Sequence, residues 1–214
     1  AGGDGSCTRA SRLTPASWLA RAVIATEDQR FYEHTGYDLA ELGAALSHNQ
    51  AQQRVARGGS TLSQQVAKLL ITGDERSPAR KLRELLYAVE LERTLGKARI
   101  LKLYLDHAPW GEGLCGAEAA ARHYFRVRAH ELTPSQASWL AAMLHNPVLE
   151  AQRWAARGGI NLARAQWVAR HLRGLSREWR TALAEDMALL DWRPLWAQPP
   201  AGATTPRKDK PAAL

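Results

Sequence analysis

The chain has 214 residues, of which 45% are hydrophobic, so it can build one domain with a real core and at most a small additional lobe. Its 29 basic and 21 acidic residues give a net charge of +8, which favours anionic partners: nucleic acid, an anionic membrane or a phosphorylated substrate. No stretch approaches the ~20 apolar residues of a membrane span. No signal peptide is recognisable, and the spacing of cysteines and histidines argues against a zinc site.

Residues 1–13 are rich in glycine and serine and are expected to form a flexible segment. A helix with an apolar face is predicted for residues 15–26, with Thr14 as its N-cap and Pro15 as its first residue. It ends at two adjacent acids, Glu27 and Asp28. The negative end of the helix and the apolar neighbours would both raise the pKa of Glu27, as a general base near neutral pH requires. Taken alone, these residues fit an ordinary polar helix end better, with a turn at Gly36.

The segment Gly-Gly-Ser-Thr-Leu-Ser-Gln-Gln-Val-Ala-Lys at residues 58–68 predicts a second helix. Thr61 and Gln64 have the spacing of a capping box, and Gly73 is placed to end the helix near residue 72. Gln65 and Lys68 share one face because they are three residues apart. A glycine-rich entry to a helix, followed by a lysine, suits an anionic phosphate group. A well-capped amphipathic helix without a ligand is the alternative.

A third helix is predicted from Ser77 and Pro78 to about residue 95, and Arg80, Lys81 and Glu84 lie in its first two turns. Surface ion pairing worth ~0.3 kcal/mol is one explanation of these charges. The other is a diphosphate site, because arginine can bind phosphate oxygens bidentately. A further helix is expected at residues 98–106, after Gly96.

The remaining chain reads as helices and loops without a convincing strand pattern. Residues 39–57 predict a short helix and a mobile segment, and the run at 117–121 predicts an alanine-rich helix. A capped helix should begin after Thr133 and end near residue 144, and two more should occupy residues 160–174 and 176–192. The tail from residue 194 is expected to be disordered. Cys7 and Cys115 could be free or paired.

Five of these stretches, in this order, resemble the five signatures of the peptidoglycan glycosyltransferases (glycosyltransferase family 51). This family is found in bifunctional penicillin-binding proteins and in monofunctional cell-wall polymerases. The matching segments are Glu27-Asp28-x-x-Phe31-x-x-His34-x-Gly36-x-Asp38, residues 58–68, Arg80-Lys81-x-x-Glu84, residues 104–125 and residues 131–137. Together they cover roughly residues 14 to 147, and their order makes a chance match very improbable.

The resemblance implies a mainly α-helical, lysozyme-like head at residues 14–193, with a small membrane-facing jaw lobe at about 39–80. It also implies polymerisation of lipid II into β-1,4 glycan strands, with inversion and release of undecaprenyl diphosphate. The expected location is the outer, periplasmic face of the bacterial cytoplasmic membrane, with the native anchor absent from this chain. The partners would be lipid II, the growing strand, the anionic membrane surface and other wall-synthesis proteins, but no nucleic acid, because no nucleic-acid motif is present.

Carried over residue by residue, the resemblance assigns Glu27 as the catalytic base and Glu84 as the second catalytic glutamate. The side chains expected to bind the diphosphate or the sugars are Lys68, Arg80, Lys81, Ser60, Thr61, Gln64 and Gln65. The side chains expected to shape the loop are Asp28, Phe31, His34 and Gly36. No cofactor is required and no metal site is expected on the protein, although Mg²⁺ or Mn²⁺ could assist at the diphosphate.

Several positions depart from the family pattern. Asp106 stands where the family usually has Asn, Trp110 where it has Phe, and Arg126-Val127 where it has Gly-Lys. None of these touches the two glutamates, so they bear on substrate fit more than on activity. No Ser-x-x-Lys or Lys-Thr-Gly is present, so no transpeptidase domain is expected. A lysozyme-like hydrolase or a catalytically silent scaffold remains the alternative, although a hydrolase would not need the cations near the glutamates.

Overall fold

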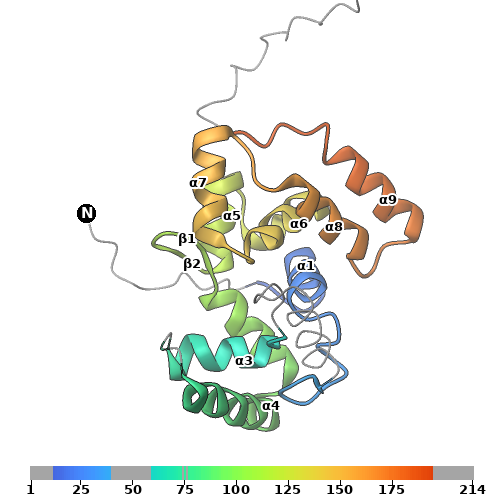
Figure 1. Ribbon diagram of the computed structural model, residues 1–214. Helices are drawn as coiled ribbons and strands as arrows, with labels where there is room; N and C mark the ends of the chain where they lie inside the picture. The colour runs from blue at the N-terminus through green and yellow to red at the C-terminus, as the bar shows by residue number, and fades with distance from the viewer. Residues whose placement is uncertain (1–11, 40–58, 74, 76, 195–214) are drawn as a thin grey trace, which may run out of the picture.

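The computed structural model describes residues 12–39, 59–73, 75 and 77–194 and has a mainly α, lysozyme-like fold (Figure 1). Residues 1–11 of the predicted flexible segment, residues 40–58 of the predicted small lobe and the predicted tail from residue 195 onward lie outside the described residues. Leu13, at the end of the predicted flexible segment, is instead buried in the core. The helices are α1 (Trp18–Glu27), α3 (Leu62–Ala67), α4 (Pro78–His107), α5 (Ala117–Phe125), α6 (Pro134–Met143), α7 (Pro147–Arg157), α8 (Leu162–His171) and α9 (Arg177–Asp186). A π-helix η1 (Lys68–Thr72), a 3-10 turn η2 (Ala129–Glu131) and the strands β1 (Pro109–Gly111) and β2 (Leu114–Cys115) complete the fold.

The helices pack in two groups. Helix α1 packs against α6 and α8, and α8 packs against α9, while α3 packs against α4. Figure 1 shows α3 and the first part of α4 side by side at the bottom of the view, away from α5 to α9. The largest fully buried side chains include Trp110, Trp139, Phe31, Leu19 and Leu140. Within the described residues, none of the helices combines the length and the apolar character that crossing a membrane requires.

Helix α1 begins three residues later than the sequence suggested. Ser17 is the N-cap and Trp18 the first helical residue. The predicted cap, Thr14, instead accepts a hydrogen bond from the Ser17 amide at 3.0 Å, and its own amide donates to Ser17 Oγ at 3.1 Å. These bonds close a tight turn with Pro15 at its second position, where the fixed φ of proline is favoured. Thr14 and Pro15 could begin either a tight turn or a helix, and in the structure they form the turn.

The capping box predicted for α3 is confirmed. Thr61 Oγ1 accepts the Gln64 amide, and Gln64 Oε1 accepts the Thr61 amide at 3.0 Å. The helical segment ends at Thr72 with Gly73 as its C-cap, as expected, but its last five residues are a π-helix. A π-turn advances the chain by about one residue per turn relative to an α-helix, so it changes which face the side chains after Ala67 occupy.

Helix α4 starts as predicted, with Ser77 Oγ accepting the Arg80 amide at 3.1 Å and Pro78 in the first turn. Gly96 interrupts it with φ 72° and ψ 165°, which are not helical values. The expected break at Gly96 is therefore confirmed, although the helix resumes at once.

The sequence analysis did not predict the strands β1 and β2, the 3-10 turn η2 or helix α7. The strands β1 and β2 form a small antiparallel hairpin, too short to show an alternating pattern. Helix α7 follows Asn146, whose Oδ1 accepts the Leu149 amide at 3.3 Å, and it begins at Pro147. An Asn cap followed by a first-turn proline is a helix-start signal, so the sequence held enough information to find α7. The capped helix after Thr133 and the two C-terminal helices are confirmed as α6, α8 and α9.

Candidate active site

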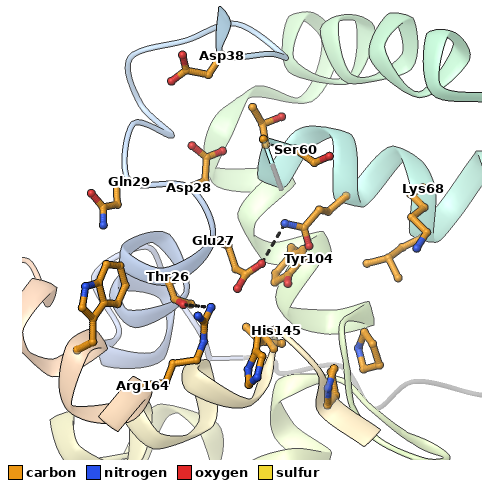
Figure 2. Close-up of a pocket in the computed structure, with 18 residues that line it drawn as sticks. Thr26, Glu27, Asp28, Gln29, Asp38, Ser60, Lys68, Tyr104, His145 and Arg164 are labelled. Atoms are coloured by element: carbon orange, nitrogen blue, oxygen red, sulfur yellow. Dashed lines mark hydrogen bonds between the residues drawn. The ribbon is translucent and has the colours of Figure 1, made fainter. Parts of the chain in front are cut away.

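A cavity of about 950 Å³ lies between the two groups of helices, and the carboxylate of Glu27 points into it (Figure 2). Glu27 is the last residue of α1, where the buried helix meets the loop that carries the rest of the first signature. In Figure 2, Arg164 lies on one side of Glu27 and Lys68 lies across the cavity. The chain therefore brings an acid and two cations to one hollow from three separate elements.

Among the described residues, the Glu27 carboxylate accepts one direct hydrogen bond, from Gln65 Nε2 to Oε2 at 3.2 Å. Burial raises the pKa of Glu27 above its ordinary value, and this is the largest effect on it. The Gln65 hydrogen bond and the charge of Arg164 act in the opposite direction, while the charge of Asp28 raises the pKa further. The direction and the leading cause agree with the expectation from the sequence.

Asp28 ties the loop after α1 to the start of α3. Its carboxylate accepts the Leu62 amide at 2.9 Å and lies 3.0 Å from His34 Nε2. Asp28 is 8% exposed. Phe31 is fully buried, and the ammonium group of Lys97 lies over its ring, 4.6 Å from the ring centre, in a cation–π contact. Asp28, His34 and Phe31 thus hold the loop after α1 in place.

Gly36 completes the loop at a point where a side chain would not fit. Its φ is 81°, and a Cβ atom would lie 2.7 Å from the backbone nitrogen of Val89 in α4. The Gly36 carbonyl accepts a hydrogen bond from Thr61 Oγ1 at 2.7 Å. The first signature therefore packs on the second through Thr61 and on α4 through Gly36.

The second signature supplies one wall of the cavity. The predicted residues that line it are Ser60, Thr61, Gln65 and Lys68. Gln64 is 4% exposed and belongs to the capping box instead. Gln65 and Lys68 both lie on the cavity side, as their spacing predicted.

The third signature forms a compact ionic cluster behind this wall. Glu84 is 2% exposed and is bound by Arg80 Nη1 at 2.5 Å and by Lys81 Nζ. Lys81 Nζ also donates to Ser60 Oγ at 2.8 Å, which joins the cluster to the cavity rim. Arg80, Lys81 and Glu84 are not among the described residues that line the cavity. The structure thus places Glu84 as the partner of two cations and not beside Glu27.

Sequence reasoning missed part of the opposite wall. The lining residues it did not propose include Thr26, Tyr104, His145, Arg164 and Trp167. Burial and the nearby Glu27 charge raise the pKa of Tyr104 well above its ordinary value. Tyr104 is the first residue of the fourth signature, and His145 follows the helix that the fifth signature opens, so those signatures pointed to the two side chains without assigning them a role. Arg164 and Trp167, on α8, lie beyond all five stretches and had no local signal.

The departures from the family pattern have structural explanations. Asp106 is 4% exposed and forms an ion pair with Lys102 at 3.0 Å. Trp110 is fully buried, and its Nε1 donates to the carbonyl of Leu140 at 3.1 Å. Arg126 is the C-cap of α5 with φ 59°, a left-handed conformation that favours glycine. These positions therefore affect packing and backbone strain away from Glu27.

Two other expectations concern metal ions and thiols. Among the residues that the structure describes, no group of three or more His, Cys, Asp or Glu side chains is arranged to hold a metal ion. Cys115 is disulfide-bonded, and Cys7, the other cysteine of the sequence, lies outside the described residues.

Comparison with known proteins agrees with the geometry. Residues 8–173 match the model of the Transglycosylase family. The chain is similar to the biosynthetic peptidoglycan transglycosylase of Nitrosomonas eutropha, with 50% identity over 129 residues, 60% of this chain and 53% of that protein. The proteins of the same name from Methylobacillus flagellatus and Yersinia pestis are 47% and 44% identical, over 68% and 74% of this chain and 64% and 65% of their own lengths. The matched part thus spans between about half and two thirds of these relatives, and the chain belongs to the Transglycosylase family.

Proposed function

We propose that this protein is a peptidoglycan glycosyltransferase that polymerises lipid II. The observation that carries the proposal is the Glu27 carboxylate, which is desolvated, held by Gln65 and directed into a large cavity that Lys68 and Arg164 also line. The similar proteins named biosynthetic peptidoglycan transglycosylase support the same activity. A raised pKa makes the Glu27 carboxylate a stronger base than an exposed glutamate, which suits proton abstraction from a sugar hydroxyl.

In the proposed reaction Glu27 takes the proton from the 4-hydroxyl of the acceptor sugar. The resulting oxygen nucleophile attacks the anomeric carbon of the lipid-linked donor from the face opposite to its diphosphate. The new bond joins O4 to C1, and the bond between C1 and the phosphate oxygen breaks. Undecaprenyl diphosphate leaves with the bonding electrons, and the α-linked donor yields a β-1,4 bond with inversion.

The cations would bind and stabilise the leaving diphosphate. Lys68 lines the cavity itself, and Lys81 reaches its rim through the hydrogen bond to Ser60. Arg80 is joined to Lys81 through Glu84, which both cations bind. Charges fixed before the reaction stabilise the developing negative charge without a cost of reorganisation. Glu84 would act by ordering Arg80 and Lys81, which it binds directly. Assistance by Mg²⁺ or Mn²⁺ at the diphosphate belongs to the proposal and is tested by adding a chelator to the assay.

We also propose that the protein works at the outer face of the cytoplasmic membrane, where a lipid-linked substrate is presented, beside other wall-synthesis proteins. In the sequence of the small lobe, Leu39, Leu42 and Leu46 offer a short apolar face, but the last two lie outside the described residues. Helices η1 and α4 pack against each other, and the structure shows further exposed apolar side chains on both. These are Leu69, Leu70, Ile71, Leu82 and Leu86. They add an apolar component to the electrostatic attraction of a chain with net charge +8.

The test is incubation of the purified protein with lipid II in detergent, followed by analysis of the product. The proposal requires glycan polymer and release of undecaprenyl diphosphate. Cleavage of finished peptidoglycan without polymer formation would support the lysozyme-like alternative, and neither activity would support the silent scaffold. The Glu27→Gln variant should lose ~10²–10⁴ in rate. Glu33→Gln is the matched control, because Glu33 lies six residues away in an exposed ion pair with Arg30 and should keep full activity.

A further inference from the structure

Arg164 has contacts that the proposed reaction does not yet use. It comes from α8, yet its Nη2 donates to the hydroxyl of Thr26 at 3.2 Å, across 138 positions of the chain. Thr26 immediately precedes Glu27 in the last turn of α1. The guanidinium of Arg164 therefore holds the segment that presents the carboxylate, as Figure 2 shows.

Among the described residues, the charge of Arg164 has no carboxylate close by to neutralise it. In the part of the chain that the structure describes, no carboxylate lies within salt-bridge distance of its guanidinium, and its buried Nε has no hydrogen-bond partner. Arginine is not deprotonated in proteins, so the partly buried guanidinium of Arg164 is a permanent cation. The positive charge of Arg164 therefore interacts electrostatically with acids that line the same cavity. Glu27 is one of them, and the charge of Arg164 lowers its pKa.

Several other ionisable groups among the described residues line the cavity. Asp28 and Asp38 come from the loop after α1, Lys68 from η1, Tyr104 from α4 and His145 from the link between α6 and α7. Asp28 disfavours a second negative charge beside it, and burial does so more strongly. Arg164 and the Gln65 hydrogen bond oppose these effects.

We propose that Arg164 is a positioning residue for the catalytic carboxylate: it fixes the end of α1 through Thr26, and its charge keeps Glu27 in the anionic form that can accept a proton. The inference rests on the proposed function for its catalytic consequence. The contact between Arg164 and α1 and the electrostatic coupling to Glu27 do not depend on that function, so they can be measured separately.

The kinetic experiment compares three variants by the pH dependence of kcat/KM for lipid II polymerisation. Arg164→Gln removes the charge and should move the acid limb of the profile to higher pH, with a loss in kcat of up to roughly 10²-fold from misplacement of the base. Arg164→Lys keeps the charge but not the planar fork, so kcat should fall while the acid limb stays in place. Thr26→Val should behave like Arg164→Lys, because it removes the acceptor and leaves the cation. Arg170→Gln, an exposed arginine on the same helix, is the control and should match the wild type.

The second experiment needs no substrate. The unfolding free energies of the wild type, Glu27→Gln, Arg164→Gln and the double variant form a thermodynamic cycle. A favourable coupling should be present at pH 7 and should vanish well below pH 4.5, the ordinary pKa of a glutamate, because protonated Glu27 has no charge to attract. If Arg164→Gln does not fold, Arg164→Met, which also removes the charge but keeps a long side chain, takes its place in the cycle and should show the same pH-dependent coupling.

The outcomes separate the two proposals. Coupling without polymerase activity would keep the electrostatic role of Arg164 and reject the proposed function. Activity with an unmoved acid limb in Arg164→Gln and no pH-dependent coupling would overturn the role of Arg164 and leave the proposed function standing.

Discussion

Asp28 offers a test of how the first two signatures are held together. The change Asp28→Ala removes the acceptor for the Leu62 amide and for His34, both of which are bonded to the buried carboxylate. A hydrogen bond to a charged group is worth ~1.5–3 kcal/mol, and a buried amide left without a partner costs ~1–3 kcal/mol. Because one carboxylate serves both donors and the surroundings can relax, we expect a loss of about 3 kcal/mol in the free energy of unfolding.

Thermal and urea denaturation measure this loss. For a chain of this size, a loss of 3 kcal/mol corresponds to a decrease in Tm of roughly 6–12 °C. Asp28→Asn keeps one acceptor oxygen without the charge and should lose about half as much free energy. Asp191→Ala is the control, since Asp191 forms an exposed ion pair with Arg193 that is worth less than about 1 kcal/mol.

The reasoning is refuted if Asp28→Ala unfolds within ~0.5 kcal/mol of the Asp191→Ala control. A native Tm combined with lost polymerisation would assign Asp28 a chemical role in place of the structural one. Both measurements are made on the same purified variants, so a preparation that fails to fold cannot be mistaken for an inactive enzyme.

Four more outcomes follow from individual positions. Arg126→Gly should raise the free energy of unfolding by ~1 kcal/mol in urea titrations, because the left-handed C-cap suits glycine; a loss of stability would contradict this. Gly36→Ala should lower Tm more than Gly96→Ala, since both have positive φ but only the Cβ at Gly36 would meet the backbone of α4, and equal effects would disprove the clash. Glu27→Gln should be more stable than the wild type at pH 7 but not below pH 4.5: a raised native pKa means that the native state binds the proton more tightly, so wild-type stability falls as pH rises through that range. A pH-independent difference in unfolding free energy would reject that assignment. Binding to anionic vesicles should weaken with salt in co-sedimentation, and Leu70→Ser should remove the salt-resistant part; binding that salt abolishes completely would leave the exposed leucines without a role.

Local signals were sufficient for most of the helices. The capping boxes at Thr61 and Thr133 depend on residues three positions apart, so the sequence alone specifies them. The break at Gly96 likewise follows from one residue that tolerates positive φ. The start of α1 was misplaced because Thr14 and Pro15 suit both a helix start and a tight turn. Ser17 closes the turn with its amide and its hydroxyl and becomes the N-cap itself.

Only part of the cavity lining could be predicted, because some of its residues are brought together by the packing of helices that are distant in the sequence. Gln65 and Lys68 belong to one helical face, so their spacing placed them together. Arg164 reaches Thr26 only because α1 packs against α8, and hydrophobic periodicity does not specify which helices meet. The ionic cluster of Arg80, Lys81 and Glu84 was expected at the phosphate site itself, and its position behind Ser60 depends on how α3 packs on α4.

The packing of α1 also has a consequence for the order in which the chain can fold. The apolar face of α1, with Leu19 and Val23 fully buried, is covered by α6 and α8, which begin at Pro134 and Leu162. A ribosome adds ~5–20 residues per second, so α1 emerges on the order of ten seconds before α8 exists to cover it. During that interval the helix that presents Glu27 cannot be in its final place, and its apolar face is available to chaperones or to other chains. The first signature is therefore synthesised early but reaches its final place beside the cavity only after α6 and α8 have docked.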